Sequence, residues 1–131
     1  MRYYIATSVD LPMDEAVART EAALSREGFG VLTRIDVAAT LQQKIGAAFR
    51  PYVILGACNP TLAHEALLLE DKVGTMLPCN VVVQQLQPGK SEVAAIDPVA
   101  SMQAIDNAAL KEAAGRVRAK LAAVIADIAS G

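Results

Sequence analysis

The chain has 131 residues, of which 53% are hydrophobic and 20% charged, and this suits one globular domain with a sizeable core. Twelve basic and fourteen acidic residues give a net charge of -2, so the chain lacks the basic field that binds a phosphate backbone, and we expect no nucleic-acid partner. The sequence has no signal-peptide pattern and no apolar run near the roughly 20 residues that span a bilayer, so we expect a soluble cytoplasmic protein with no membrane partner.

Strand and helix patterns alternate along the first part of the chain. Residues 2–9 alternate enough to predict a half-buried strand, and Pro12 suits the first turn of the helix that follows. Gly28 suits the left-handed residue that ends this helix. We then expect a second strand at residues 29–37 and a short helix at residues 38–49.

The middle of the chain holds its most hydrophobic run. Residues 52–58 are apolar without a break, which predicts a central strand. Asn59 can cap a helix and Pro60 suits the first helical position, so we expect a helix over residues 60–70. The next strand is expected at residues 80–86.

The last third predicts a hairpin followed by helices. Turn-forming residues at 87–90 favour a hairpin, so a strand at residues 92–96 is expected to pair with the strand before it. Asp97-Pro98 opens a helical region, which breaks or is capped again at residues 106–107. An apolar stripe, suited to a core or to a partner helix, then continues to the end of the chain: Leu110, Ala114, Val117, Leu121, Val124 and Ile128. This order of elements predicts a single α+β domain, with an α/β fold as the alternative.

Two short motifs, each with a cysteine followed by an asparagine, are the only constellation with possible chemistry. They are GACNP at residues 56–60 and LPCN at residues 77–80. The expected helix between them travels about 16 Å, and the eight residues after it span up to about 26 Å, so the chain can leave Cys58 and return beside it at Cys79. If the two strands are antiparallel neighbours, both thiols lie at the same end of the sheet.

Three interpretations of this cysteine pair stay open. In the first, Cys58 and Cys79 are small buried hydrophobes, with Asn59 and Asn80 as cap and turn residues. In the second, the two thiols and His64 form a ligand or soft-metal site, although the spacing fits no zinc signature and a fourth ligand is missing. In the third, they carry out thiol redox chemistry, with Cys58 activated by the helix start. His64, the only histidine, is more simply an exposed residue.

No catalytic motif accompanies the cysteines. The sequence has no G-x-S-x-G elbow, no complete glycine-rich dinucleotide loop and no G-K-[ST] phosphate loop. We therefore favour a protein without enzymatic activity, and the sequence points to no cofactor. In a reducing cytoplasm the two cysteines are expected to be free thiols.

Four separated motifs give the chain a family resemblance. They are EGFGVLTRID at residues 27–36, GACNP at 56–60, LPCNVVV at 77–83 and IDP at 96–98. In this order and spacing the sequence resembles the domain-of-unknown-function 302 family over essentially its whole length. The resemblance implies an α+β domain similar to the TATA-binding-protein-like fold, with helices packed on an antiparallel sheet, and usually a homodimer. It implies no particular activity.

These observations lead to one hypothesis with two alternatives. We expect a homodimeric protein that binds a small ligand or a soft metal ion near the two Cys-Asn motifs. The expected ligand-binding residues are Cys58, Asn59, Pro60, Cys79 and Asn80. The candidate metal ligands are Cys58, Cys79 and His64. The alternatives are a thiol-dependent redox protein that uses Cys58, and a structural or interaction module with no catalytic activity.

Overall fold

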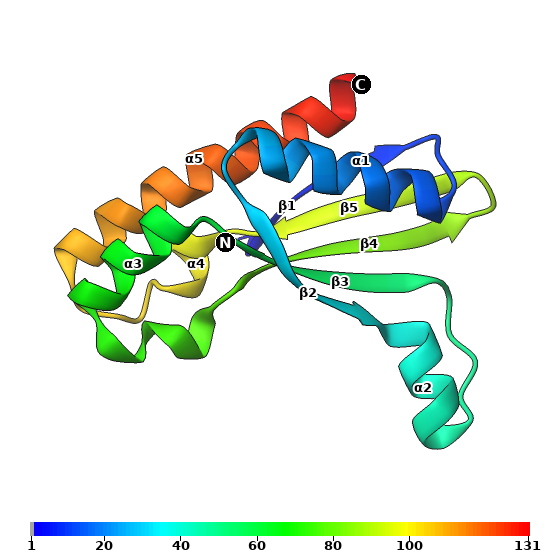
Figure 1. The fold of residues 1–131 in the computed structure, drawn as a ribbon, viewed down its shortest axis with the longest axis horizontal. Helices are drawn as coiled ribbons and strands as arrows, with labels where there is room; N and C mark the ends of the chain where they lie inside the picture. The colour runs from blue at the N-terminus through cyan, green and yellow to red at the C-terminus, as the bar shows by residue number, and fades with distance from the viewer. Residues whose placement is uncertain (1) are drawn as a thin grey trace.

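The computed structural model describes residues 2–131 as an antiparallel sheet with helices packed on it (Figure 1). The strands are β1 (Tyr4–Val9), β2 (Gly30–Asp36), β3 (Tyr52–Cys58), β4 (Cys79–Gln87) and β5 (Lys90–Ile96). The helices are α1 (Met13–Arg26), α2 (Val37–Ile45), α3 (Pro60–Leu69), the 3-10 helix η1 (Asp71–Met76), α4 (Pro98–Ser101) and α5 (Ala108–Ser130). The strands lie in the order β1-β5-β4-β3-β2, and every pairing is antiparallel. The predicted α+β class is therefore confirmed over the α/β alternative, which needs parallel strands.

The core lies between one face of the sheet and the pair of helices α1 and α5 (Figure 1). Buried and more exposed residues alternate along β5 and along much of β3 and β4, because successive side chains of a strand point to opposite faces. The largest buried core side chains are Leu24, Leu55, Val81, Val83, Val93, Leu121, Val124 and Ile128. The second half of the apolar stripe near the C-terminus, Leu121, Val124 and Ile128, thus belongs to this core.

Glycines end the first two helices. Gly28 has a φ of +83°, and the N–H groups of Gly28 and Phe29 reach the carbonyls of Ser25 and Leu24, as the sequence predicted for the end of α1. The helix expected at residues 38–49 is shorter than predicted. It ends at Ile45 because Gly46 adopts a φ of +66° and stops it in the same way.

The sheet face opposite α1 and α5 is largely free of helices within residues 2–131, where α2 contacts β2 and β3. The helix α2 projects from the end of β2 to the side away from α1 and α5 (Figure 1). Among the described residues, no helix combines the length and the apolarity that a membrane crossing requires.

Candidate functional site

The two cysteines lie at the same end of the sheet. Strands β3 and β4 are antiparallel neighbours, and Ala57 pairs with Cys79. Cys58 is the last residue of β3 and Cys79 the first residue of β4. The conditional prediction from the sequence is therefore confirmed, because the chain leaves the sheet at Cys58 and returns beside it at Cys79.

Asn59 connects the first cysteine motif to the turn between α1 and β2. Its Oδ1 accepts a hydrogen bond from the N–H of Leu62 at 3.2 Å, which caps α3 as the sequence predicted. Its Nδ2 donates to the carbonyl of Glu27 at 3.5 Å and lies next to Gly28. The side chain of Asn59 thus both caps α3 and joins the GACNP motif to the EGFG segment.

Gly56 allows the two cysteine motifs to pack closely. A Cβ atom at this position would lie 2.1 Å from Oγ1 of Thr33 and 2.8 Å from Cγ of Pro78. The cis peptide bond at Leu77-Pro78 precedes β4, so the proline lies outside the sheet ladder, where its missing N–H is not needed. Glycine at position 56 therefore leaves the space that Thr33 and Pro78 occupy.

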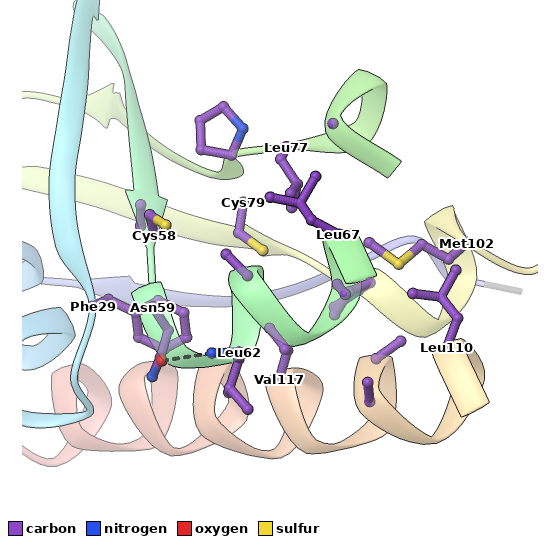
Figure 2. Close-up of a pocket in the computed structure, with 18 of the residues that line it drawn as sticks. Phe29, Cys58, Asn59, Leu62, Leu67, Leu77, Cys79, Met102, Leu110 and Val117 are labelled. Carbon is purple, nitrogen blue, oxygen red and sulfur yellow. Dashed lines mark hydrogen bonds between the residues drawn. The ribbon is translucent and has the colours of Figure 1, made fainter. Parts of the chain in front are cut away.

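A cavity of about 350 Å³ opens beside this end of the sheet, between α3, α4 and α5 (Figure 2). Its mouth includes the exposed side chains of Leu32 on β2 and Leu67 on α3. The complete lining is Phe29, Leu32, Ala57, Cys58, Asn59, Leu62, Ala63, Ala66, Leu67, Gly74, Leu77, Pro78, Cys79, Pro98, Met102, Leu110, Ala113, Ala114 and Val117. No charged side chain belongs to it, and Asn59 is its one amide.

Both thiols line the cavity and both are free. Cys58 is half-buried, whereas Cys79 is only 7% exposed. Burial raises the pKa of the Cys79 thiol to about 11, and the nearby Cys58 adds to the shift because two thiolates repel each other. Cys79 therefore remains a neutral thiol at ordinary pH.

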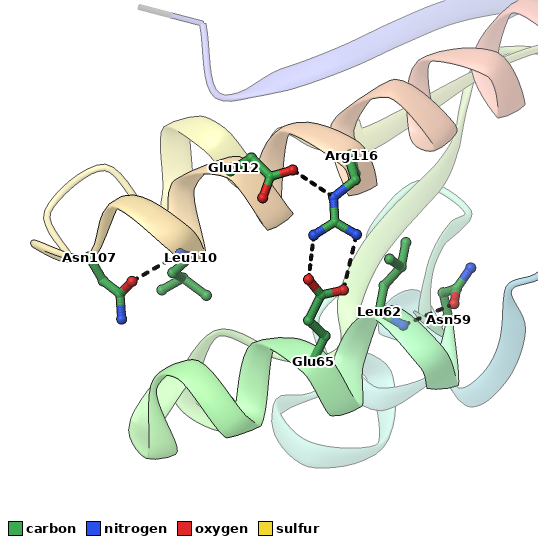
Figure 3. A network of polar contacts seen from close by, with 7 residues as sticks. All are labelled: Asn59, Leu62, Glu65, Asn107, Leu110, Glu112 and Arg116. Carbon is green, nitrogen blue, oxygen red and sulfur yellow. Dashed lines mark hydrogen bonds and ion pairs between the residues drawn. The ribbon is translucent and has the colours of Figure 1, made fainter.

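The helix α3 forms one wall of the cavity, and polar contacts join it to α5 and to the residues just before α5 (Figure 3). Glu65 on α3 accepts two hydrogen bonds from the guanidinium of Arg116 on α5, and Arg116 also donates to Glu112 at 3.1 Å. These bonds lower the pKa of Glu65 and raise that of Arg116. At the end of α3, Nδ2 of Asn107 donates to the carbonyl of Leu69 at 2.9 Å.

The expected ligand-binding residues divide between two faces of the molecule. Cys58, Asn59 and Cys79 line the cavity, but Pro60 is exposed at the start of α3 and does not line it. Asn80 also lies outside the cavity, because it follows Cys79 on β4 and so points to the opposite face of the sheet. There it borders a second, open hollow of about 240 Å³, which Thr75 and Ser101 also line. Three of the five expected ligand-binding residues therefore line the cavity, which has fewer polar groups than the sequence indicated.

The three candidate metal ligands are not assembled. His64 is exposed on α3 and does not line the cavity that holds Cys58 and Cys79. Across residues 2–131, no group of three or more histidine, cysteine, aspartate or glutamate side chains is placed to hold a metal ion. The helix α3 turns Leu62, Ala63, Ala66 and Leu67 toward the cavity, and His64 lies off that face.

Most of the cavity wall was not expected from the sequence. Phe29, Met102 and Ala113 were assigned no role, and Leu110, Ala114 and Val117 were placed in the apolar stripe as core or partner surface. The sequence feature that could have pointed to the cavity was the apolar face of α3, whose buried residues Leu62 and Ala66 do not belong to the core between the sheet and α1 and α5. An amphipathic pattern identifies such a face but not whether it meets another side chain or a cavity.

Comparison with known proteins places the chain in a family. A family profile described as domain of unknown function DUF302 matches residues 5–128. The chain belongs to the DUF302 family. A crystal structure of an uncharacterized conserved protein DUF302 from Bacillus stearothermophilus is similar to this DUF302 chain, with a TM-score of 0.90 and 34% sequence identity. The similarity covers 98% of this chain and 99% of that chain. No curated protein matches the sequence.

Proposed function

We propose that this DUF302 protein binds an uncharged, apolar small molecule in the cavity beside Cys58 and Cys79. The observation that carries the proposal is the cavity itself, about 350 Å³ in volume and lined by apolar side chains. Sites for small molecules are concave, mostly apolar and about 300–1,000 Å³ in volume. The cavity lies at the small end of this range, which favours a compact ligand.

The polar groups of the lining argue for a ligand without charge. Both atoms of the Asn59 amide already take part in hydrogen bonds within the chain. A carboxylate or phosphate inside the cavity would lose its water and gain no cationic partner, which is strongly unfavourable. A hydrocarbon or aromatic ligand needs no such partner and gains from the burial of its surface.

The raised pKa of Cys79 makes thiolate chemistry a weaker explanation of the same site. Thiol exchange needs a thiolate as the attacking group. Because Cys79 resists ionisation, Cys58 would have to act without it at ordinary pH. Cys58 is the more accessible thiol, so its side chain is a convenient site for blocking the cavity.

Fluorescence titration with 1-aminoanthracene, a neutral aromatic probe, tests the proposal. We expect saturable binding at one probe per chain, and at least tenfold weaker binding of the anionic probe anthracene-9-carboxylate. Ala113→Leu places a larger side chain in the cavity wall and should weaken binding of the neutral probe at least tenfold. Alkylation of Cys58 with N-ethylmaleimide should have the same effect.

Ala123→Leu is the matched control, because Ala123 is exposed on the same helix α5 and does not line the cavity. This variant should bind the neutral probe as the unaltered protein does. The proposal is contradicted if the neutral probe does not saturate, or if Ala113→Leu folds normally and binds as tightly as Ala123→Leu.

A further inference from the structure

Two free thiols lie side by side on the wall of the cavity. Cys58 ends β3, Cys79 begins β4, and Cys79 pairs with Ala57, the neighbour of Cys58. Paired residues of an antiparallel ladder have Cα atoms about 4.5–5.5 Å apart, and one step along a strand adds about 3.4 Å. The Cα atoms of Cys58 and Cys79 are therefore about 6 Å apart, inside the range of about 4.4–6.8 Å over which two cysteines can be joined through their sulfur atoms.

The two thiols differ in their access to solvent and share one cavity. Cys58 is half-buried and Cys79 is only 7% exposed. Figure 2 shows both side chains at the strand ends beside α3, where they line the cavity. A ligand inside the cavity can therefore contact both sulfur atoms at once.

The site offers two sulfur ligands and no third. Across residues 2–131, no group of three or more histidine, cysteine, aspartate or glutamate side chains is placed to hold a metal ion. A structural zinc ion needs four protein ligands, so this pair does not suit it. Trivalent arsenic is soft, as sulfur ligands require, and it forms three bonds. A compound in which carbon already fills one of these bonds needs only the two that Cys58 and Cys79 can supply.

We propose that the cavity binds an uncharged organic compound of trivalent arsenic, with the arsenic bonded to the sulfur atoms of Cys58 and Cys79 and the organic group packed among the apolar side chains. This inference rests on the proposed function, since the cavity must accept the organic group. Phe29, Met102 and Leu110 belong to the lining that would surround it. Inorganic arsenite would instead bring a hydroxyl group into this apolar lining, and burial of a hydroxyl without a hydrogen bond is unfavourable.

Capture of phenylarsine oxide, a simple compound of this class, is a condensation in which arsenic stays trivalent. The two S–H bonds and the arsenic–oxygen double bond break, two arsenic–sulfur bonds form, and the oxygen leaves as water with both thiol protons. Cys58, the more accessible thiol, attacks first. Burial raises the pKa of Cys79, so this thiol keeps its proton until the second step, when the proton leaves with the hydroxyl group on arsenic. The product carries no charge, which suits a lining without charged side chains.

Intact-protein mass spectrometry with phenylarsine oxide tests the proposal. Reduced protein receives one equivalent of the probe in the presence of excess glutathione, a monothiol that displaces arsenic from a single cysteine more readily than from a pair. Each unaltered chain should gain one phenylarsenic group and lose two thiol hydrogens. Cys58→Ala and Cys79→Ala should each retain at least tenfold less of the probe, because only one arsenic–sulfur bond can form. Cys58→Ala changes a half-buried side chain, so it keeps the test decisive if circular dichroism shows that Cys79→Ala does not fold.

A second pair of variants tests whether the organic group lies in the cavity. Ala113→Leu fills part of the cavity and should weaken capture of phenylarsine oxide at least tenfold. Ala123→Leu, exposed on the same helix and outside the lining, should capture the probe as the unaltered protein does.

The outcomes separate this inference from the proposed function. Saturable binding of 1-aminoanthracene without capture of phenylarsine oxide overturns the arsenic site and leaves the apolar cavity as a binding site. Failure of both probes contradicts the proposed function as well. Capture that persists in Cys58→Ala overturns the bridge between the two thiols, and equal capture by Ala113→Leu and Ala123→Leu overturns the placement of the organic group.

Discussion

Gly56→Ala tests the packing that brings the two cysteine motifs together. The added methyl carbon would lie 2.1 Å from Oγ1 of Thr33 and 2.8 Å from Cγ of Pro78. Both atoms belong to neighbouring segments, Thr33 through its pairing with Gly56 across β2 and β3, and Pro78 at the start of β4. Thr33 or the strand that carries it must therefore move by about 1 Å before the contact becomes acceptable.

The expected loss of stability is large for a single methyl group. Overpacking costs about 1–3 kcal/mol, and the short contact places this variant near about 3 kcal/mol. An unfolding entropy of about 2.1 cal/mol/K per residue amounts to roughly 0.28 kcal/mol/K for 131 residues, so we expect a fall in Tm of about 11 °C. Thermal unfolding followed by circular dichroism measures it.

Gly30→Ala is the matched control, because its added carbon would meet nothing within 4 Å. It should change the stability by no more than about 1 kcal/mol, and in the favourable direction if at all. Thr33→Ala removes the closest contact, so the double variant with Gly56→Ala should be more stable than additivity predicts. A Tm for Gly56→Ala that matches that of Gly30→Ala would refute the reasoning.

Two further predictions follow from the pKa shifts of Cys79 and Glu65. Because the pKa of Cys79 rises from 9.0 to about 11 on folding, its contribution to stability is complete below pH 9 and is lost as the pH rises toward 11. Denaturant unfolding should therefore show a steeper alkaline loss of stability for the unaltered protein than for Cys79→Ala, and iodoacetamide should modify Cys58 before Cys79 at pH 8. Equal alkaline slopes, or faster modification of Cys79, would contradict this. Arg116 lowers the pKa of Glu65 below 4.5, so the contribution of Glu65 to stability is present above pH 4.5 and is lost as the pH falls through the pKa of the folded state. Between pH 6 and pH 3 the Tm of the unaltered protein should therefore fall more than that of Glu65→Gln. Parallel curves of Tm against pH would be the contrary result.

The parts of the site that depend on local chemistry could be predicted from the sequence. Asn59 caps α3 and Gly28 ends α1 because an amide acceptor and a left-handed glycine meet needs of the backbone that arise within a few residues. The same rule explains the end of α2, where Gly46 was overlooked. These helix caps depend only on residues that are close in the chain, so they can be predicted from the sequence.

The composition of the cavity depends on distances that the sequence does not contain. Val117 continues the stripe of Leu121 and Val124 and packs against the same core, yet it also lines the cavity, which they do not. All three residues are apolar, so their side chains alone do not show which of them meets a cavity. The position of Asn80, in contrast, could have been predicted, because side chains alternate along a strand and Asn80 must therefore lie on the face opposite Cys79. The expectation that both residues bind one ligand came from their shared motif and did not use this alternation.

The way α3 is held has a consequence for how the cavity is filled and emptied. Directional contacts fix it at three points, through Asn59 at its start, Glu65 in its middle and Asn107 at its end. Local opening of such an element requires less free energy than global unfolding. Opening of α3 would break these polar contacts and expose the buried side chains of Leu62 and Ala66. Neither residue belongs to the core between the sheet and α1 and α5, so that core would stay folded while the cavity wall opened.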